Sequence, residues 1–243
     1  MRITERFDSF RGTSKENVAR KFGVHGVNVF ARKAVTATDW NPQQHWDAVY
    51  RTRRPGEVSW YQTNPVRSRE LIGRTGASFT APIIDVGGGA SRLVDYMLAD
   101  GFTDITVLDV SGAALRQARE RLGSAAERVT WIEADITTFV PPRRYQVWHD
   151  RAVFHFLTSV QDRQRYVSVL RTALAPHGHV VIATFGLGGP ERCSGLSVQR
   201  YSASTLAAEL GSGFTLMAEE QESHVTPAGA AQVFQYCWFR LAR

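Results

Sequence analysis

A run of apolar residues that ends in an acid and a glycine cluster constrains this chain more than any other segment. It reads Ile83-Ile84-Asp85-Val86-Gly87-Gly88-Gly89-Ala90-Ser91. Apolar and β-branched residues on both faces predict a strand inside a parallel sheet, here over residues 82–86. The glycines let the backbone turn sharply and approach a ligand. A helix predicted from residue 91 to residue 99 would point its first N–H groups at that ligand, so the segment predicts a site for a nucleotide-like cofactor in an α/β fold.

A second acid follows at the end of the next predicted strand. Asp109 closes the run Ile105-Thr106-Val107-Leu108 and comes 22 residues after Gly87. At about this spacing, a carboxylate on the neighbouring strand reaches a ribose diol. A glycine-rich turn alone also fits a simple loop. The strand, the helix and the second acid together favour the cofactor site.

The third glycine position indicates the kind of cofactor. A dinucleotide site has the pattern G-x-G-x-x-G, in which the third glycine lets the helix pack closely. Gly87 and Gly89 hold the first two positions, but Arg92 holds the third. A cofactor with adenosine and no phosphates needs the turn and the ribose acid, and it tolerates a larger residue at the third position. S-adenosylmethionine is such a molecule.

From about Trp40 to Arg243 the chain resembles the class I S-adenosylmethionine-dependent methyltransferases. The resemblance rests on the glycine segment above, on Leu108-Asp109-Val110-Ser111, and on Ala134-Asp135-Ile136. It implies a Rossmann-like, doubly wound seven-stranded sheet, mostly parallel with an antiparallel last strand. It also implies S-adenosyl-L-methionine as the cofactor, and we expect no metal site.

The resemblance assigns roles in cofactor binding. Gly87 and Gly89 would line the methionine moiety, with Asp85 near its ammonium group, and Asp109 would accept both ribose hydroxyls. Asp135 with Ile136 would meet the adenine, although Asp135 equally fits a turn residue or a helix cap. The complete expected set is Asp85, Gly87, Gly89, Asp109, Val110, Asp135, Ile136 and Arg151.

A polar segment after the fourth predicted strand is expected between cofactor and acceptor. It reads Trp148-His149-Asp150-Arg151-Ala152-Val153-Phe154-His155-Phe156. By the resemblance, Asp150, Arg151 and His155 are the polar groups nearest the chemistry, and Asp150 and His155 are the candidate catalytic residues. An imidazole titrates near neutral pH and suits a general base. A hydrogen-bonded wall residue is the alternative for His155.

Aromatic and loop residues are the candidates for acceptor binding. Trp60 and Tyr61 offer flat surfaces to the sulfonium and the adenosine, since aromatic faces attract cations, with core packing as the alternative. The loop after the fifth predicted strand lies where ligands bind in open α/β sheets, with structural loop residues as its alternative. The expected set is Trp60, Tyr61, Phe154, Cys193 and Arg200.

The rest of the chain alternates as a doubly wound fold requires. Strands are predicted at 82–86, 104–109, 129–132, 145–149, 179–185, 214–223 and 231–241. Helices are predicted at 43–50, 65–74, 91–99, 112–122, 160–175 and 202–210.

Charge is distributed unevenly along the chain. Residues 1–38 carry all three lysines and five arginines against three acids, whereas residues 39–243 carry 21 arginines against 20 acids. This break predicts two regions: a basic N-terminal extension over residues 1–38 and a methyltransferase domain over residues 39–243. The extension fits an arm, a lid, a start-site artefact or a presequence. Because that domain is nearly neutral, the net charge of +6 does not indicate a nucleic-acid partner.

Composition limits the remaining possibilities. The chain has 243 residues, 43% of them hydrophobic, which suffices for one α/β domain with a sizeable core. No apolar run reaches membrane-spanning length, so we expect no membrane partner. Cys193 and Cys237 are widely separated, which favours reduced thiols and a cytoplasmic location. The sequence does not indicate an oligomeric state.

The acceptor is the least constrained part of the prediction. The chain lacks, after the fourth strand, the Asn-Pro-Pro-Tyr type signature of enzymes that methylate nucleic-acid and glutamine amino groups, which favours a small-molecule acceptor. The segments Trp46-Asp47 and Val58-Ser59-Trp60-Tyr61-Gln62 resemble the thiopurine and thiol methyltransferase branch and some protein-lysine methyltransferases. A thiol is the leading prediction, since a modest pKa depression yields the thiolate. A protein-lysine methyltransferase and a non-catalytic cofactor-binding module are the alternatives.

Overall fold

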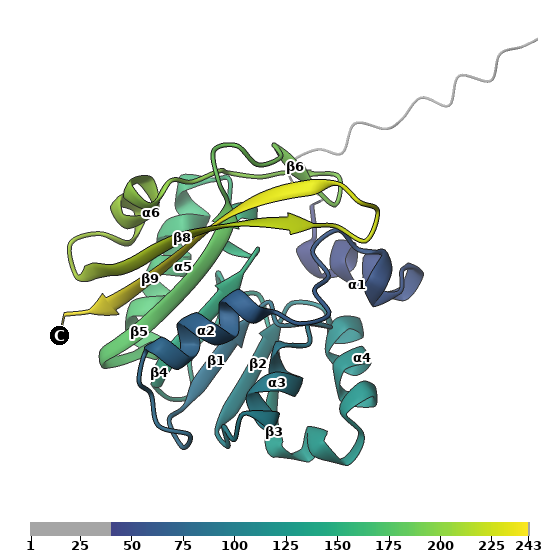
Figure 1. The fold of residues 1–243 in the computed structure, drawn as a ribbon, viewed down its shortest axis with the longest axis horizontal. Helices are drawn as coiled ribbons and strands as arrows, with labels where there is room; N and C mark the ends of the chain where they lie inside the picture. The colour runs from purple at the N-terminus through teal and green to yellow at the C-terminus, as the bar shows by residue number, and fades with distance from the viewer. Residues whose placement is uncertain (1–39, 243) are drawn as a thin grey trace, which may run out of the picture. The chain divides into compact units, whose positions relative to one another are not determined.

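A seven-stranded sheet organises the computed structural model, which describes residues 40–242 (Figure 1). The strand order is β3-β2-β1-β4-β5-β9-β8. The pairs among β1 to β5 are parallel, and β9 is antiparallel to both of its neighbours. The predicted doubly wound, mostly parallel sheet with an antiparallel last strand is thereby confirmed. Its strands are β1 (Ile83–Val86), β2 (Ile105–Asp109), β3 (Val129–Glu133), β4 (Tyr145–Arg151), β5 (Leu174–Phe185), β8 (Phe214–Val225) and β9 (Ala231–Leu241).

Residues Asn41–Arg243 form a compact unit by themselves. The predicted basic extension, residues 1–38, lies outside the described residues and stays a prediction. None of the helices in the described part of the chain is long and apolar enough to cross a bilayer.

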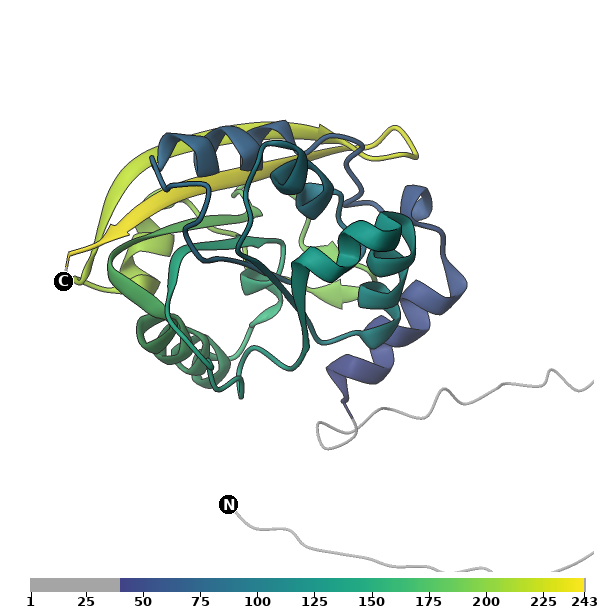
Figure 2. The same cartoon turned by 90° about the horizontal axis from the view of Figure 1, so that it is seen from below.

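Helices cover both faces of the sheet, because alternate strand residues point to opposite sides. Ile83, Ile105 and Val107 pack with residues of α2, α3 and α4, whereas Ile84 and Trp148 pack with α5 and α6. Figure 2 shows α2 and α3 on one side of the sheet and α5 on the other. The helices are α1 (Pro42–Thr52), α2 (Val66–Arg74), α3 (Leu93–Ala99), α4 (Gly112–Leu122), α5 (Val160–Ala173) and α6 (Ala203–Leu210).

Two local features differ from the prediction. β5 begins at Leu174, directly after α5, because Leu174 already pairs with Tyr145 on the far side of a register shift. The loop after β5 contains a short hairpin of β6 (Arg192–Cys193) and β7 (Leu196–Ser197). Its two turn residues, Ser194 and Gly195, both have positive φ, as a tight two-residue hairpin turn requires.

The strand order reverses between β1 and β4. In open α/β sheets, ligands bind outside the carboxyl ends of the strands at such a reversal. The glycine segment leaves β1 at this edge, and the segment with Asp150 and Arg151 leaves β4 beside it. The fold therefore brings these two predicted site segments together.

Candidate functional site

The glycine loop lies tightly against two neighbouring elements. Gly87 and Gly89 have φ of +67° and +38°, in the region that favours glycine. A Cβ on Gly87 would lie 2.0 Å from Val153 Cγ2, and one on Gly89 would lie 2.6 Å from Asp109 Oδ2. The backbone thus approaches both the segment after β4 and the acid at the end of β2.

Asp109 is an almost fully buried carboxylate, 6% exposed. One oxygen accepts a hydrogen bond from the Ser111 backbone N–H at 2.8 Å. Burial raises the pKa of Asp109 to about 7, and the nearby charges of Asp85 and Asp47 act in the same direction. A carboxylate that is held here with few partners is suited to accept hydrogen bonds from a ligand.

Helix α1 covers this acid. Asp47 accepts hydrogen bonds from Ser111 Oγ at 2.7 Å and from the Ala113 N–H at 3.1 Å, at the start of α4. Gln117 on α4 donates to the Tyr50 carbonyl at 2.5 Å. The added Cβ on Gly89 would also lie 3.4 Å from the Tyr50 hydroxyl. The α1–α4 contact therefore holds Tyr50 next to the glycine loop.

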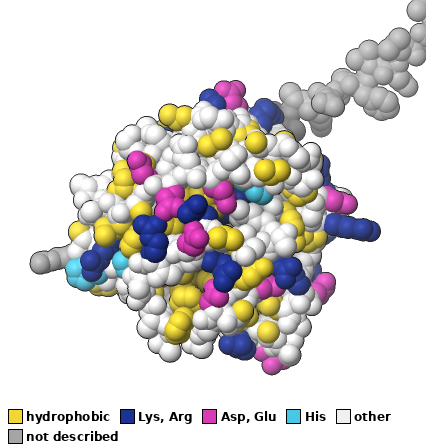
Figure 3. All heavy atoms as spheres, in the orientation of Figure 1, with side chains coloured by type: hydrophobic (Ala, Val, Ile, Leu, Met, Phe, Trp, Pro, Cys, Tyr) yellow, Lys and Arg dark blue, Asp and Glu magenta, His cyan; other side chains and the backbone are white. Residues whose placement is uncertain are grey.

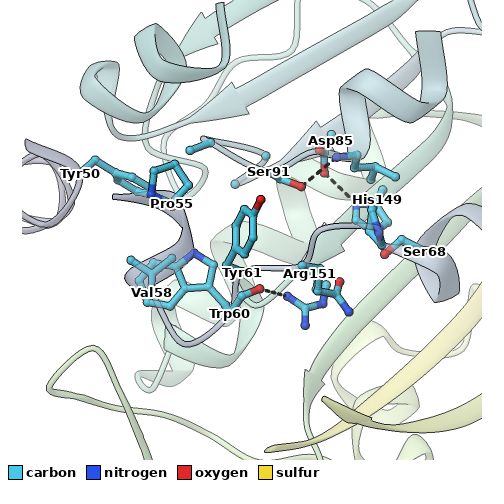
Figure 4. Close-up of a pocket in the computed structure, with 16 residues that line it drawn as sticks. Tyr50, Pro55, Val58, Trp60, Tyr61, Ser68, Asp85, Ser91, His149 and Arg151 are labelled. Atoms are coloured by element: carbon cyan, nitrogen blue, oxygen red, sulfur yellow. Dashed lines mark hydrogen bonds and ion pairs between the residues drawn. The ribbon is translucent and has the colours of Figure 1, made fainter. Parts of the chain in front are cut away.

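A pocket with about 570 Å³ of free space, including its open mouth, lies beside the glycine loop, and Tyr50 is one of its lining residues. Figure 4 shows Tyr61 across its middle, with Val58 and Trp60 on one side and Asp85, His149 and Ser68 on the other. The predicted Trp60 and Tyr61 thus line a pocket that also contains Asp85, Gly87 and Arg151.

A buried hydrogen-bonded chain forms the polar wall of this pocket. His149 Nδ1 is 2.7 Å from Asp85 Oδ1, and His149 Nε2 is 2.9 Å from Ser68 Oγ. Neither His149 nor Ser68 was among the site residues predicted from the sequence. The signal that could have found His149 is its register: it pairs with Asp85 on the adjacent strand, so both side chains leave the same face of the sheet.

Arg151 is held by four neighbours. Its Nε donates to the Tyr236 hydroxyl at 2.9 Å, and its NH1 donates to the Trp60 carbonyl at 2.9 Å. Glu222 lies 3.9 Å away, and the guanidinium stacks 4.2 Å above the Phe234 ring centroid. Arg151 therefore ties the aromatic segment at Trp60 to the end of the sheet.

The predicted catalytic Asp150 lies on the opposite face of β4. It is fully buried and accepts hydrogen bonds from the Val153 and Phe154 N–H groups and, at 2.7 Å, from the Tyr166 hydroxyl. Burial raises the pKa of Asp150 to about 6 despite these bonds. The structure does not bring this carboxyl into the pocket, and its contacts are those of a residue that fixes the turn after β4.

His155 is a fully buried wall residue in this structure. Its ring lies between Phe156 and Phe185, and Nδ1 accepts the Phe185 N–H at 3.3 Å. Burial lowers the pKa of His155 to about 3. Such a ring is neutral and weakly basic at neutral pH, so the geometry favours the wall alternative over a general base.

The remaining acceptor candidates are separated from the pocket. Phe154 packs against Tyr166 and Tyr201 in the core. Arg200 donates to the Leu187 and Gly189 carbonyls and pairs with Glu191, so it stabilises its own loop. Cys193 is buried beside Ser59, and burial raises the pKa of its thiol to about 11. These contacts of Phe154, Arg200 and Cys193 fit the alternative that each is a structural residue.

The expected adenine side of the site is formed by the loop after β3. Asp135 accepts hydrogen bonds at 2.8 Å from both the N–H and the hydroxyl of Thr137, which fits the turn alternative. Ile136 is buried, and Val110 is half-buried directly after Asp109. The Ala134 N–H donates to the Asp109 carbonyl at 3.0 Å, so this loop lies beside Asp109.

The sequence of this region matches a known family. Residues 84–180 match the family model of a methyltransferase domain. The fold around them is the one that class I S-adenosylmethionine-dependent methyltransferases have, and S-adenosylmethionine is the cofactor of that class. The predicted thiopurine or thiol branch stays a prediction.

The individual relatives have low sequence identity to this chain. A ubiquinone biosynthesis O-methyltransferase of Photorhabdus laumondii is 27% identical over 126 residues, 51% of either chain. An EEF1A lysine methyltransferase 2 of Danio rerio is 22% identical over 182 residues, 66% of this chain and 77% of the relative. The chain spans about half the length of the first of these relatives.

Solved structures share the fold. One of them comes from work on the conversion of a disulfide bond into a thioacetal group during echinomycin biosynthesis. It superposes with a TM-score of 0.64 at 19% sequence identity, and the alignment covers 82% of this chain and 92% of the other chain. A 1,6-didemethyltoxoflavin-N1-methyltransferase of Burkholderia thailandensis, with bound 1,6-didemethyltoxoflavin and S-adenosylhomocysteine, has a TM-score of 0.59 at 20% identity, covering 74% and 78%. At these identities the likeness concerns the fold alone.

Proposed function

We propose that this protein transfers a methyl group from S-adenosylmethionine to a small-molecule acceptor. One observation carries the proposal: the glycine loop runs between two buried acids, Asp85 and Asp109, at the carboxyl ends of neighbouring strands and beside a pocket. A cofactor with an amino acid at one end and a ribose at the other has a polar group for each of these carboxylates.

Roles in cofactor binding follow from these positions. Gly87 and Gly89 let the backbone approach the methionine moiety, Asp85 accepts its ammonium group, and Asp109 accepts the ribose hydroxyls. Arg151 positions Trp60 at the pocket through its bond to the Trp60 carbonyl. The proposed adenine contacts are Val110, Asp135 and Ile136.

S-adenosylmethionine supplies a methyl group on a sulfonium, whose thioether leaves readily. The protein then has to align the acceptor, exclude water and set the acceptor's protonation. Trp60 and Tyr61 serve the first two tasks, because their rings cover the pocket beside the glycine loop. Aromatic rings also attract a sulfonium cation.

The acceptor class is proposed from the environment of the two predicted catalytic residues. In the described part of the chain, His155 is buried with a strongly lowered pKa, and the Asp150 carboxyl is occupied by internal bonds. A thiol needs little help from a base, since a modest pKa depression gives thiolate at neutral pH. We therefore propose a thiol or a similarly acidic nucleophile as acceptor, and we do not assign Cys193, which is buried and is not among the residues that line the pocket, a role as nucleophile.

A protein-lysine acceptor is the second candidate. The relative from Danio rerio is named for lysine methylation, and its similarity extends over two thirds of this chain. A lysine amine needs a carboxylate that holds it near the methyl group and a base that deprotonates it. Asp150, a predicted catalytic residue, is unsuited to either task, because its carboxylate accepts hydrogen bonds from the turn after β4.

Calorimetry tests the cofactor site. Asp109→Ala should weaken S-adenosylmethionine binding by about 1 to 3 kcal/mol through loss of charged hydrogen bonds. Unchanged affinity would contradict the assignment.

Incubation with methyl-labelled cofactor and cell lysate separates the two acceptor classes: label in a protein band would overturn the small-molecule proposal. Cofactor binding without turnover of any thiol, amine or hydroxyl acceptor would favour the non-catalytic module.

A further inference from the structure

Arg151 is a buried arginine at the wall of the pocket. Its side chain is 10% exposed, and it lines the pocket together with Trp60 and Gln62. Its Nε donates to the Tyr236 hydroxyl and its NH1 donates to the Trp60 carbonyl, each at 2.9 Å. In Figure 4 the guanidinium lies beside Trp60, with the bond to the carbonyl dashed. Two of the three guanidinium nitrogens therefore have partners.

The third nitrogen, NH2, is left over. It is buried and has no hydrogen-bond partner among residues 40–242. Glu222 Oε2 is 3.9 Å away, which is beyond hydrogen-bonding distance. A buried donor without a partner costs roughly 1 to 3 kcal/mol, and more when the group is charged. The fold thus leaves one donor of a buried cation without an acceptor at the pocket wall.

Glu222 is already engaged by other donors. Its two oxygens accept hydrogen bonds from Gln62 Nε2 at 3.0 and 3.2 Å, and Oε2 also accepts the Tyr236 hydroxyl at 3.1 Å. A negative group of a ligand would bond to NH2 directly, at about 2.8 Å. It would therefore be attracted by the guanidinium more strongly than it is repelled by the more distant Glu222.

The position of Arg151 in the sheet places it past the amino acid end of the proposed cofactor site. The proposed ribose acid, Asp109, is on β2, and the proposed ammonium acid, Asp85, is on the adjacent β1. Arg151 comes next, on β4, two residues after His149, which pairs with Asp85. Residues two apart on a strand point to the same face. A carboxylate at Arg151 can therefore belong to the cofactor's amino acid or to an acceptor beside it.

We propose that Arg151 is an oxyanion-binding residue and that its NH2 group bonds to a carboxylate of a ligand in this pocket. This inference deepens the proposed function and rests on it for the identity of the cofactor. A guanidinium donates charge-assisted hydrogen bonds to carboxylates, which are about twice as strong as neutral ones. Because NH2 is buried, a side chain near it must move aside. Gln62, a pocket residue that shares Glu222 with Arg151, is placed to do so.

Calorimetry on the full chain tests the cofactor as the source of the carboxylate. The ligands are S-adenosylhomocysteine and its decarboxylated analogue, which keeps the ammonium group and lacks only the carboxylate. Arg151→Gln keeps an N–H donor for the Trp60 carbonyl but removes the charge. If the cofactor's carboxylate bonds to Arg151, this variant should weaken binding of S-adenosylhomocysteine about tenfold and binding of the analogue less than about twofold.

A second pair of ligands tests an acceptor as the source. Benzoate and benzamide have the same shape and differ in charge, and their flat rings suit a wall that contains Trp60 and Tyr61. Each is titrated into the protein alone and into its complex with S-adenosylhomocysteine. If an acceptor's carboxylate bonds to Arg151, benzoate should bind about tenfold more tightly than benzamide, and Arg151→Gln should remove this preference.

Two further variants separate charge recognition from a structural effect. Glu222→Gln leaves Arg151 in place and removes the nearby negative charge, so it should strengthen binding of the carboxylate member of the responsive pair about threefold and leave its neutral partner unchanged. Arg163→Gln is the matched control, because Arg163 is 12% exposed and pairs with Glu209 outside the pocket. It should leave both pairs unchanged.

The outcomes are distinct. A loss confined to the carboxylate member of either pair supports the inference and identifies the source. Equal losses within each pair, or no losses, would show that Arg151 only anchors Trp60 and would overturn the inference; if benzoate does not bind, the cofactor pair decides alone. If Arg151→Gln fails to fold, Glu222→Gln decides, and unchanged binding of both carboxylates overturns the inference. If S-adenosylhomocysteine does not bind the unmodified protein, the proposed function fails, while the benzoate pair still tests Arg151.

Discussion

Asp109 is a buried carboxyl that costs the folded protein stability when it is charged. Its carboxylate is 6% exposed and has a pKa of about 7, compared with 3.8 for an ordinary aspartate. The folded state therefore holds a proton on this group more tightly than the unfolded state does. Between about pH 4 and about pH 7, the free energy of unfolding falls as pH rises, because the buried group must become charged.

Replacing this carboxyl by an amide tests that cost. Asp109→Asn should raise the free energy of unfolding at about pH 8, by an amount of up to about 4 kcal/mol for the full shift, and should have little effect near pH 4. The measurement is chemical denaturation at both pH values without ligand. Asp135→Asn, in the neighbouring loop, is the control and should show no such difference. A destabilised Asp109→Asn protein at pH 8 would contradict the prediction.

Helix α1 packs on the start of α4 beside the glycine loop. Its Asp47 accepts hydrogen bonds from Ser111 Oγ and the Ala113 N–H, and so satisfies donors in the first turn of α4. Burial pushes the pKa of Asp47 upward, but the hydrogen bonds from Ser111 and Ala113 outweigh it and the pKa lies below its ordinary value. This contact gives stability at neutral pH that is lost as pH falls through the lowered pKa.

Two variants separate the stability of α1 itself from its attachment to α4. Asp47→Ala should lower the free energy of unfolding by about 1 to 2 kcal/mol and expose the amides at the start of α4 to hydrogen exchange. Asn41→Ala removes the cap of α1 itself, whose side chain accepts the Gln44 N–H at 3.0 Å. It should leave the α4 amides protected. Equal exchange of those amides in both variants would show that Asp47 does not attach α1.

At the scale of the whole molecule, the described unit is self-contained and evenly charged. Asn41–Arg243 forms one compact unit, and Figure 3 shows acidic and basic side chains interspersed on one face. On α2, Arg67 and Arg74 both pair with Glu220 of β8. The absence of a nucleic-acid partner stays a prediction, as does the cytoplasmic location; Cys193 and Cys237 are both free and buried.

Truncation tests the domain boundary. A protein without residues 1–38 should keep its midpoint of thermal unfolding within a few degrees and bind S-adenosylhomocysteine with similar affinity, because the unit that begins at Asn41 has its own core. Removal of residues 1–52 is the matched control. It also deletes Asp47 and Tyr50 and should weaken binding. Loss of folding in the shorter truncation would show that the basic extension belongs to the domain.

The order of strands and helices could be predicted from local patterns, because each element has its own periodicity and its own start and stop signals. β1, β2 and α4 begin and end within a residue of the prediction. The start of β5 was missed, since its first residues, through Pro176 and Gly178, carry no strand signal and pair with β4 only across a register shift. The β6–β7 hairpin was missed for a similar reason, because each strand has two residues.

The sequence by itself determined the class of fold and the cofactor loop, since glycines between a strand and a helix and an acid on the next strand are local signals. Tertiary structure alone decided which polar groups face the pocket. In the folded chain, the Asp150 side chain lies on the other face of β4 and His155 is buried. His149 contacts both Asp85 and Ser68. The physical reason is that adjacent residues of a strand point to opposite faces, and which face lines a pocket depends on the elements that pack against it.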